Sequence, residues 1–220
     1  EYALAPYVSK TFEKHKSRLQ KYCSHLADGG TVESVAWELT EQDTFQAMEA
    51  LIHNLNTMNS RAGAQVPFSS INYGTGTTKE QRLIIKSILM ATERGLGHGE
   101  TPIFPVQVFK VKEGVNFYPG DPNYDLFELS VKVSAKRLFP NWEFLDAPFN
   151  LKFYKKGDPD TEVATMGCRT RVMANRHGAS TTSGRGNLSF TSINLPRLAI
   201  EAHGDVRKFM QSLREMAEIV

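Results

Sequence analysis

The chain is poor in cysteine, in long apolar runs and in excess charge, and each shortage excludes a class of protein. Its 220 residues include two cysteines, too few for the disulfide framework of a small secreted protein, so we expect free thiols. No apolar run approaches the roughly 18 residues of a membrane-spanning helix, and residues 1–4 resemble no signal peptide. The net charge of +2 lacks the basic field that drives non-specific nucleic-acid binding. We therefore expect a cytoplasmic protein that binds neither membrane nor nucleic acid.

The composition that is present is that of an ordinary globular protein. Hydrophobic residues make up 40% of the chain and charged residues 23%, which excludes a mainly disordered polypeptide. The length allows one large hydrophobic core or two small ones. The first residue is not methionine, so we expect a fragment or a processed chain.

Apolar side chains at helical spacing predict two helices before residue 60, over about residues 6–26 and 32–59. In the second helix, Met48, Leu51, Ile52 and Leu55 form one apolar stripe. Packing in a core is the simplest interpretation of this stripe.

Residues 61–220 alternate between strand and helix patterns. The predicted elements are a strand at 66–73, a helix at 78–94, a strand at 103–112, a helix at 123–138, strands at 149–154 and 188–194, and a helix at 196–220. Thr77 and Glu80 match a capping box at the start of the first of these helices. Residues 161–186 read as a loop, with or without a short hairpin. The order predicts an α/β fold with helices packed outside a largely parallel sheet.

Cys168 lies in a polar stretch between Gly167 and Arg169, an unusual setting for a cysteine that only fills a core. A nucleophilic thiol would need a base and an orienting group, and His177 with Asn175 are the nearest candidates in sequence. Taken without any resemblance, these residues favour a structural cysteine.

A second candidate site lies where the first strand of residues 61–220 meets its helix. Ser69 and Ser70 precede the turn at residues 74–78, and free N–H groups at a helix N-terminus favour an anion. The spacing to Lys79 is not that of a phosphate-binding P-loop. Simple helix capping competes with a substrate phosphate as the explanation. No histidine or cysteine spacing matches a metal site, so no metal ligand is expected.

Several stretches, in this order, resemble the catalytic region of the anaerobic, glycyl-radical ribonucleoside triphosphate reductases. They are QVPFSSINYG at 65–74, PIFPVQVFKVKEG at 102–114, PNYD at 122–125, AKR at 135–137, TMGCRT at 165–170, GRGN at 184–187 and INLPR at 193–197. The resemblance implies a ten-stranded α/β barrel with helices outside and a cysteine-bearing finger loop inside. Residues 1–220 would be a single partial domain from the middle of that barrel, with 1–60 helical, 61–220 built of strand–helix units and the finger loop at about 161–186.

The resemblance also implies residue roles. Cys168 would become the thiyl radical that abstracts the 3′ hydrogen of the substrate ribose, and Asn187 would lie beside the sugar. Met166 and Thr170 flank Cys168 by two residues, a spacing that places all three on one side of an extended loop. Ser69 and Ser70 would contribute to substrate binding. The implied reaction converts ribonucleoside triphosphates to deoxyribonucleoside triphosphates for DNA synthesis. A nucleotide-binding regulatory module without redox activity is the alternative.

The resemblance implies partners that this segment does not itself carry. The parent protein would use a glycyl radical, a structural zinc, and ATP or deoxynucleotide effectors. It would form a homodimer, take electrons from formate or a thiol, and need an iron–sulfur activase that uses S-adenosylmethionine. Cys23 follows Lys21 and Tyr22 on a lysine-rich helix and does not match the family's upstream catalytic cysteine. The isolated segment is therefore expected to be inactive and to bind no cofactor.

Overall fold

The structure is a computed structural model that describes residues 1–23, 29–60, 63–156, 158–167, 170–172, 175, 177–179, 181–182 and 191–219. The chain divides into two compact units, Glu1–Ser183 and Gly184–Val220. Within the described residues, none of the helices combines the length and the apolarity needed to cross a membrane.

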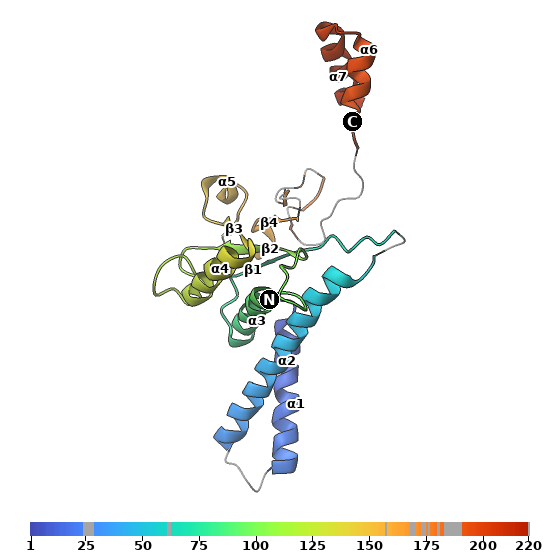
Figure 1. The fold of residues 1–220 in the computed structure, drawn as a ribbon. Coiled ribbons are helices and arrows are strands. Elements are labelled where there is room, and N and C mark those ends of the chain that lie inside the picture. The colour runs from blue at the N-terminus through green and yellow to red at the C-terminus, as the bar shows by residue number, and fades with distance from the viewer. Residues whose placement is uncertain are drawn as a thin grey trace. The chain divides into compact units, whose positions relative to one another are not determined.

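Two long helices form the N-terminal part of the first unit, as the sequence predicts. Helix α1 spans Ala5–Cys23 and helix α2 spans Gly29–Thr57, and the two lie side by side (Figure 1). The predicted apolar stripe is partly confirmed, because Met48 and Ile52 are buried in the main core.

Three described strands form a parallel sheet in the order β1–β2–β3. They are β1 (Ser70–Tyr73), β2 (Val106–Val111) and β3 (Asn141–Phe144). Helix α3 (Lys79–Arg94) connects β1 to β2, and helix α4 (Tyr124–Arg137) connects β2 to β3. The predicted strand–helix–strand unit is therefore confirmed and is repeated once.

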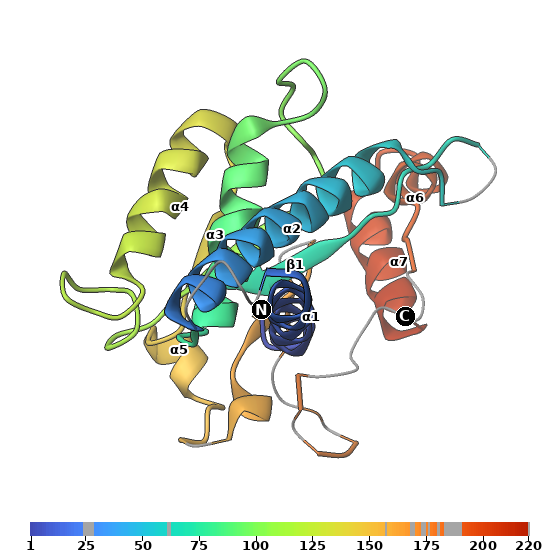
Figure 2. The same cartoon turned by 90° about the horizontal axis from the view of Figure 1, so that it is seen from below.

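The main core lies on one face of this sheet. Tyr73, Phe109 and Val111 project from β1 and β2 into a cluster with buried residues of α3 and α4, such as Leu89 and Val133. Helix α3 lies between α2 and α4 (Figure 2). Because side chains alternate along a strand, the apolar positions fix which residues point to the other face.

A buried polar chain crosses this core without leaving an unpaired group among its members. The Tyr73 hydroxyl donates to Gln107 Oε1 at 2.6 Å, and Gln107 Nε2 donates to Thr92 Oγ1 at 2.7 Å. Thr92 Oγ1 donates in turn to the Ile88 carbonyl at 2.7 Å. Burial raises the pKa of Tyr73 well above its ordinary value, so the phenol stays protonated and remains a donor.

The prediction of a strand at 149–154 is wrong. The third strand is β3, at Asn141–Phe144, and Pro148–Leu151 forms the short helix α5. Apolar Phe149, Leu151 and Phe153 alternate as in a strand, but Pro148 opens a helical turn, where its missing N–H costs nothing.

The predicted capping box is displaced by one residue. The Thr78 hydroxyl accepts from the Gln81 N–H, and the Gln81 side chain accepts from the Thr78 N–H. These two residues form the capping box that was predicted for Thr77 and Glu80.

The loop predicted at 161–186 contains a hairpin. A 3₁₀ turn at Pro159–Thr161 leads to β4 (Ala164–Thr165), which pairs antiparallel with β5 (Arg171–Val172).

In the second unit, the single predicted helix is two helices, α6 (Leu195–Ala202) and α7 (Val206–Ile219). His203 and Gly204 have φ values of 51° and 86°, and this left-handed turn ends α6. Of the strand predicted at 188–194, residues 191–194 are not in a strand and the others lie outside the described residues.

Candidate active site

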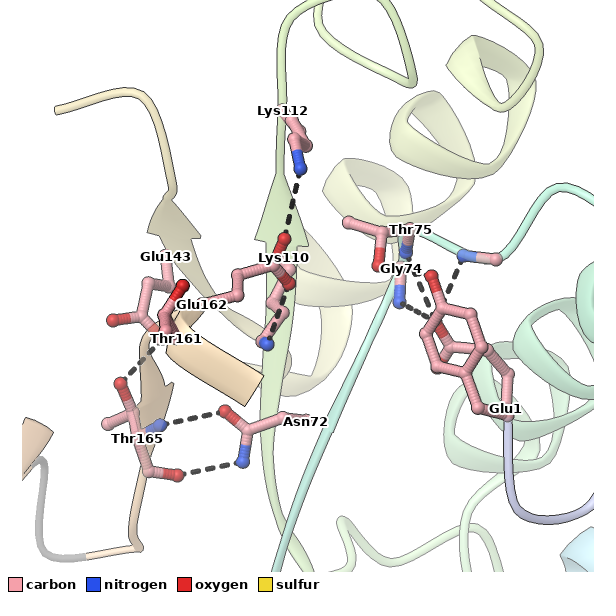
Figure 3. Close-up of polar contacts among 12 residues, drawn as sticks. Glu1, Asn72, Gly74, Thr75, Lys110, Lys112, Glu143, Thr161, Glu162 and Thr165 are labelled. Atoms are coloured by element: carbon pink, nitrogen blue, oxygen red, sulfur yellow. Dashed lines mark hydrogen bonds and ion pairs between the residues drawn. The ribbon is translucent and has the colours of Figure 1, made fainter. Parts of the chain in front are cut away.

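The face of the sheet opposite the core is largely polar. Its polar side chains are Ser70 and Asn72 on β1, Lys110 on β2, and Asn141 and Glu143 on β3, and its apolar ones are Val106 and Val108 on β2. The register places Lys110 beside Glu143. Parallel sheets normally have apolar cover on both faces. A polar face on such a sheet therefore indicates a site, and the β4–β5 hairpin lies against it (Figure 3).

Thr165 on β4 is held by both outer strands of the sheet. Asn72 Nδ2 donates to the Thr165 carbonyl at 2.8 Å, and the Thr165 N–H donates to Asn72 Oδ1 at 2.9 Å (Figure 3). The Thr165 hydroxyl donates to Glu143 Oε2 at 2.6 Å. Thr165 and Glu143 are 9% and 8% exposed, so these bonds are shielded from water.

Three of the predicted site residues meet near this contact. The Met166 N–H donates to the Thr170 carbonyl at 2.9 Å, which closes the hairpin. A Cβ added to Gly167 would lie 3.3 Å from Ser70 Cβ and 2.8 Å from Phe68 Cε1, so the loop passes close to β1. Ser69 is used locally, since its hydroxyl donates to the Pro67 carbonyl at 3.3 Å. Cys168 and Asn187 lie outside the described residues.

A cavity of about 750 Å³ adjoins the polar face. Met166 and Thr165 border it on the hairpin side, and Asn141 and Glu143 border it on the sheet side. Its volume lies in the range of sites that hold small organic ligands. Met166 therefore lines a ligand-sized cavity, and its role in substrate binding stays a prediction.

Arg171 contributes positive charge to the same cavity. Its guanidinium donates to Asn150 Oδ1 at 3.1 Å and lies 4.5 Å from the centre of the Phe149 ring. A guanidinium has five N–H donors, so Arg171 can hold this contact to Asn150 and still meet an anionic or hydroxylated ligand.

Glu162 binds two lysines beside the site. Its carboxylate oxygens lie 3.1 Å from Lys110 Nζ and 3.0 Å from Lys112 Nζ (Figure 3). Burial alone would raise the pKa of Glu162, but the two ammonium groups outweigh it and hold the pKa below its ordinary value. Burial would likewise lower the pKa of Lys112, and Glu162 instead raises it.

The predicted anion site at the turn after β1 holds a carboxylate of the chain itself. Glu1 Oε1 accepts from the N–H groups of Gly74, Thr75 and Gly76 at 3.3, 3.2 and 3.0 Å (Figure 3). Consecutive N–H groups in such a turn form an anion-binding concavity. The turn therefore binds an anion, and any other anion would have to displace Glu1.

Residues of the alternative Cys/His arrangement serve a local turn. Asn175 Oδ1 accepts from the His177 N–H at 3.0 Å, and His177 is exposed. Among the described residues, no three His, Cys, Asp or Glu side chains form a group that could hold a metal ion.

The sequence interpretation missed Asn72, Glu143, Thr165 and Arg171. Asn72 lies inside the stretch at 65–74, and its alternation with the apolar Ile71 and Tyr73 was the one available signal that it points away from the core. Glu143 carried the same signal between Trp142 and Phe144, but no strand was predicted at its position.

Comparison with known proteins gives one consistent result. The family model described as anaerobic ribonucleoside-triphosphate reductase matches residues 1–220. The chain is 36% identical over 223 residues to the anaerobic ribonucleoside-triphosphate reductase of Enterobacteria phage T4, covering 98% of this chain and 35% of that protein. It is 34% identical over 215 residues to the protein of the same name from Escherichia coli K12, covering 96% of this chain and 28% of that protein. The chain therefore spans about a third of the length of these relatives.

Proposed function

This chain belongs to the anaerobic ribonucleoside-triphosphate reductase family, and we propose that it forms the central part of the catalytic core of such an enzyme. The parent enzyme would convert ribonucleoside triphosphates to deoxyribonucleoside triphosphates. The observation that best supports this assignment is the position of Met166. This residue lies two positions before Cys168, borders the cavity and belongs to a hairpin fixed to the polar face of the sheet.

The proposed reaction begins and ends at Cys168. Its thiyl radical takes the 3′ hydrogen of the ribose, so that an S–H bond forms as the C3′–H bond breaks. The 2′ hydroxyl then takes up a proton and leaves as water, and C2′ gains a hydrogen as the reductant supplies two electrons and a proton. Formate would be oxidised to carbon dioxide, or a thiol pair to a disulfide. Cys168 finally returns its hydrogen to C3′ and is a radical again, so that the thiyl group is a catalyst.

The residues around Cys168 would bind and orient the ribose. The Asn187 amide can both donate to and accept from sugar hydroxyls. Met166 and Thr170 would flank the substrate, and Ser70 would lie beside the loop at Gly167. Enclosure of the reacting atoms would exclude water and competing hydrogen donors.

A ten-stranded barrel with an internal finger loop is the proposed architecture of the parent. Two features support it: the repeated strand–helix unit, and a hairpin on the face of the sheet opposite α3 and α4. The loop between β4 and β5 would be the finger, with Cys168 at its centre.

The remaining partners are proposed for the parent polypeptide. A glycyl radical elsewhere in the parent would supply the oxidising equivalent to Cys168. A structural zinc, ATP or deoxynucleotide effectors, a homodimeric assembly and an iron–sulfur activase using S-adenosylmethionine complete the proposal, with the cytoplasm as its location.

Replacement of Cys168 in a full-length reductase carrying this segment tests the function. Cys168→Ala should abolish deoxynucleotide formation, because no other atom at that position can carry the hydrogen. The glycyl-radical signal in electron paramagnetic resonance and the binding of nucleotide should persist. Cys23→Ser is the matched control, and we expect it to keep its activity. Retained reduction by Cys168→Ala would contradict the proposal and favour the regulatory module.

A further inference from the structure

We propose that Asn72 and Glu143 are positioning residues, which fix Thr165 and through it the loop that carries Cys168. This inference rests on the proposed function. It concerns residues on β1 and β3 that lie 93 and 22 positions away from Thr165 in the chain.

The Asn72 side chain binds the Thr165 backbone through two hydrogen bonds, as the backbone of a neighbouring strand would. Its side-chain amide offers one donor and one acceptor, and the Thr165 backbone uses both, at 2.8 and 2.9 Å. This reciprocal pair fixes the rotation of the Thr165 peptide groups as well as their distance from β1. An aspartate could accept from the Thr165 N–H but could not donate to its carbonyl.

Glu143 fixes the other side of Thr165. Its carboxyl group is buried, and Glu143 Oε2 accepts the Thr165 hydroxyl at 2.6 Å. On the adjacent strand, Lys110 pairs in register with Glu143, while its ammonium group binds Glu162. A buried carboxylate is costly unless it is hydrogen-bonded, so Glu143 and Thr165 hold each other in place.

The hairpin transmits this position to Cys168. Met166, which follows Thr165, is hydrogen-bonded to Thr170, so the three residues between them must form the connection. Cys168 is the middle one of the three. Gly167 passes so close to β1 that a Cβ there would lie 3.3 Å from Ser70 Cβ. A shift of Thr165 would therefore shift Met166 and Gly167, the two residues that precede Cys168 in the chain.

Hydrogen-atom transfer is sensitive to such a shift, because the reacting atoms must be close and aligned. A misplacement of about 1 Å can lower a rate about 100-fold. Loss of Asn72 or Glu143 should therefore slow the reaction itself and leave substrate binding and the glycyl radical in place.

The test uses paired variants in a full-length reductase that carries this segment. We expect Asn72→Ala to lower kcat about 100-fold with KM changed less than about twofold and an undiminished glycyl-radical signal. Asn72→Asp should fall between Asn72→Ala and the parent. Glu143→Gln keeps an oxygen acceptor for the Thr165 hydroxyl and should stay within about threefold of the parent kcat, whereas Glu143→Leu should not.

A chemical measurement separates this inference from the proposed function. The rate at which iodoacetamide alkylates Cys168 is measured by peptide mass spectrometry, relative to the rate at Cys23. This rate depends on the position of the loop and does not require turnover. We expect Asn72→Ala to change that rate severalfold. Thr92→Val, which removes a buried hydroxyl from the core, is the control and should leave the rate unchanged.

An unchanged kcat and an unchanged alkylation rate in both Asn72→Ala and Glu143→Leu would overturn the positioning role. A changed alkylation rate, together with retained reduction by Cys168→Ala, would contradict the proposed function but leave the anchoring of the loop standing.

Discussion

At the scale of single residues, Glu162 illustrates how a carboxylate can be kept charged although it is largely buried. Two lysines share its charge, and the three side chains are 13% to 28% exposed. Removing the carboxylate would leave two ammonium groups close together without their common partner. We therefore expect the cluster of Glu162, Lys110 and Lys112 to stabilise the folded state more than a fully solvated ion pair does.

Glu162→Gln should destabilise the chain by about 1–2 kcal/mol near pH 7. The folded-state pKa of Glu162 is depressed, so its contribution is present above the ordinary value of 4.5 and is lost as the pH falls through the folded pKa. The folded-state pKa of Lys112 is raised, so its share is present below the ordinary value of 10.5 and is lost as the pH rises through the folded pKa.

Urea unfolding of the parent and Glu162→Gln across this pH range measures the difference. The two should converge at both extremes. Glu201→Gln is the control, because Glu201 pairs with Arg197 at an exposed site and should change stability by less than about 0.5 kcal/mol. A difference of equal size at acid and neutral pH would show that the charge of Glu162 is not the cause.

At the scale of elements, the junction between β1 and α3 depends on the absence of one side chain. Gly74 has a φ of 130°, and a Cβ there would lie 2.7 Å from the Lys110 carbonyl oxygen, a backbone atom of β2. The Gly74 carbonyl also accepts from the buried Asn116 and Asn123 side chains at 3.0 and 3.2 Å. Contacts with Lys110, Asn116 and Asn123 therefore fix the conformation of the turn.

Gly74→Ala should destabilise the chain by roughly 2–3 kcal/mol, because it adds both backbone strain and a clash that a strand cannot relieve. Gly97→Ala is the matched control, since nothing lies within 4 Å of the added Cβ, and its effect should be near zero. Thermal unfolding of both variants provides the measurement. Equal midpoints for the two variants would contradict this account of the junction.

Periodicity predicted the elements whose packing follows directly from their own sequence. The helices α1 to α4 and the strands β1 and β2 have stripes or alternations that match the face they bury. The strand β3 is as short as β1, and its polar–apolar alternation at Asn141–Phe144 was passed over in favour of the longer alternation at Phe149, Leu151 and Phe153, whose side chains are exposed. Short elements are set by their neighbours, and a single sequence does not contain that information.

The residues of the candidate site likewise fall into two groups, those predicted from local sequence and those that depend on the tertiary fold. Met166 and Thr170 were predicted by their spacing around Cys168, a local property. Asn72 and Glu143 reach the site only because β1 and β3 lie on either side of β2, so their roles depend on the tertiary fold. Helix capping and a substrate phosphate were the two interpretations of the turn after β1. The carboxylate of Glu1, which accepts from the N–H groups of this turn, comes from far away in the sequence, and no local pattern indicated it.

At the scale of the whole molecule, the described sheet has two free edges. Among the described residues, β1 and β3 each pair only with β2, so the outer edge of each strand has no strand partner there. Free edges invite pairing with further strands. Since the relatives are about three times longer, we expect those edges to be covered by other segments of the parent polypeptide.

The isolated 220-residue chain should consequently form no deoxynucleotide, even with activase, S-adenosylmethionine and formate. The oxidant for Cys168 and the rest of the enclosure would both be missing, and enclosure is what protects a thiyl radical from water and other donors. Product analysis beside a full-length reductase carrying the same segment provides the measurement and its positive control. Turnover by the isolated chain would show that the radical source and a complete site lie within these 220 residues, and would contradict the proposal of a partial core.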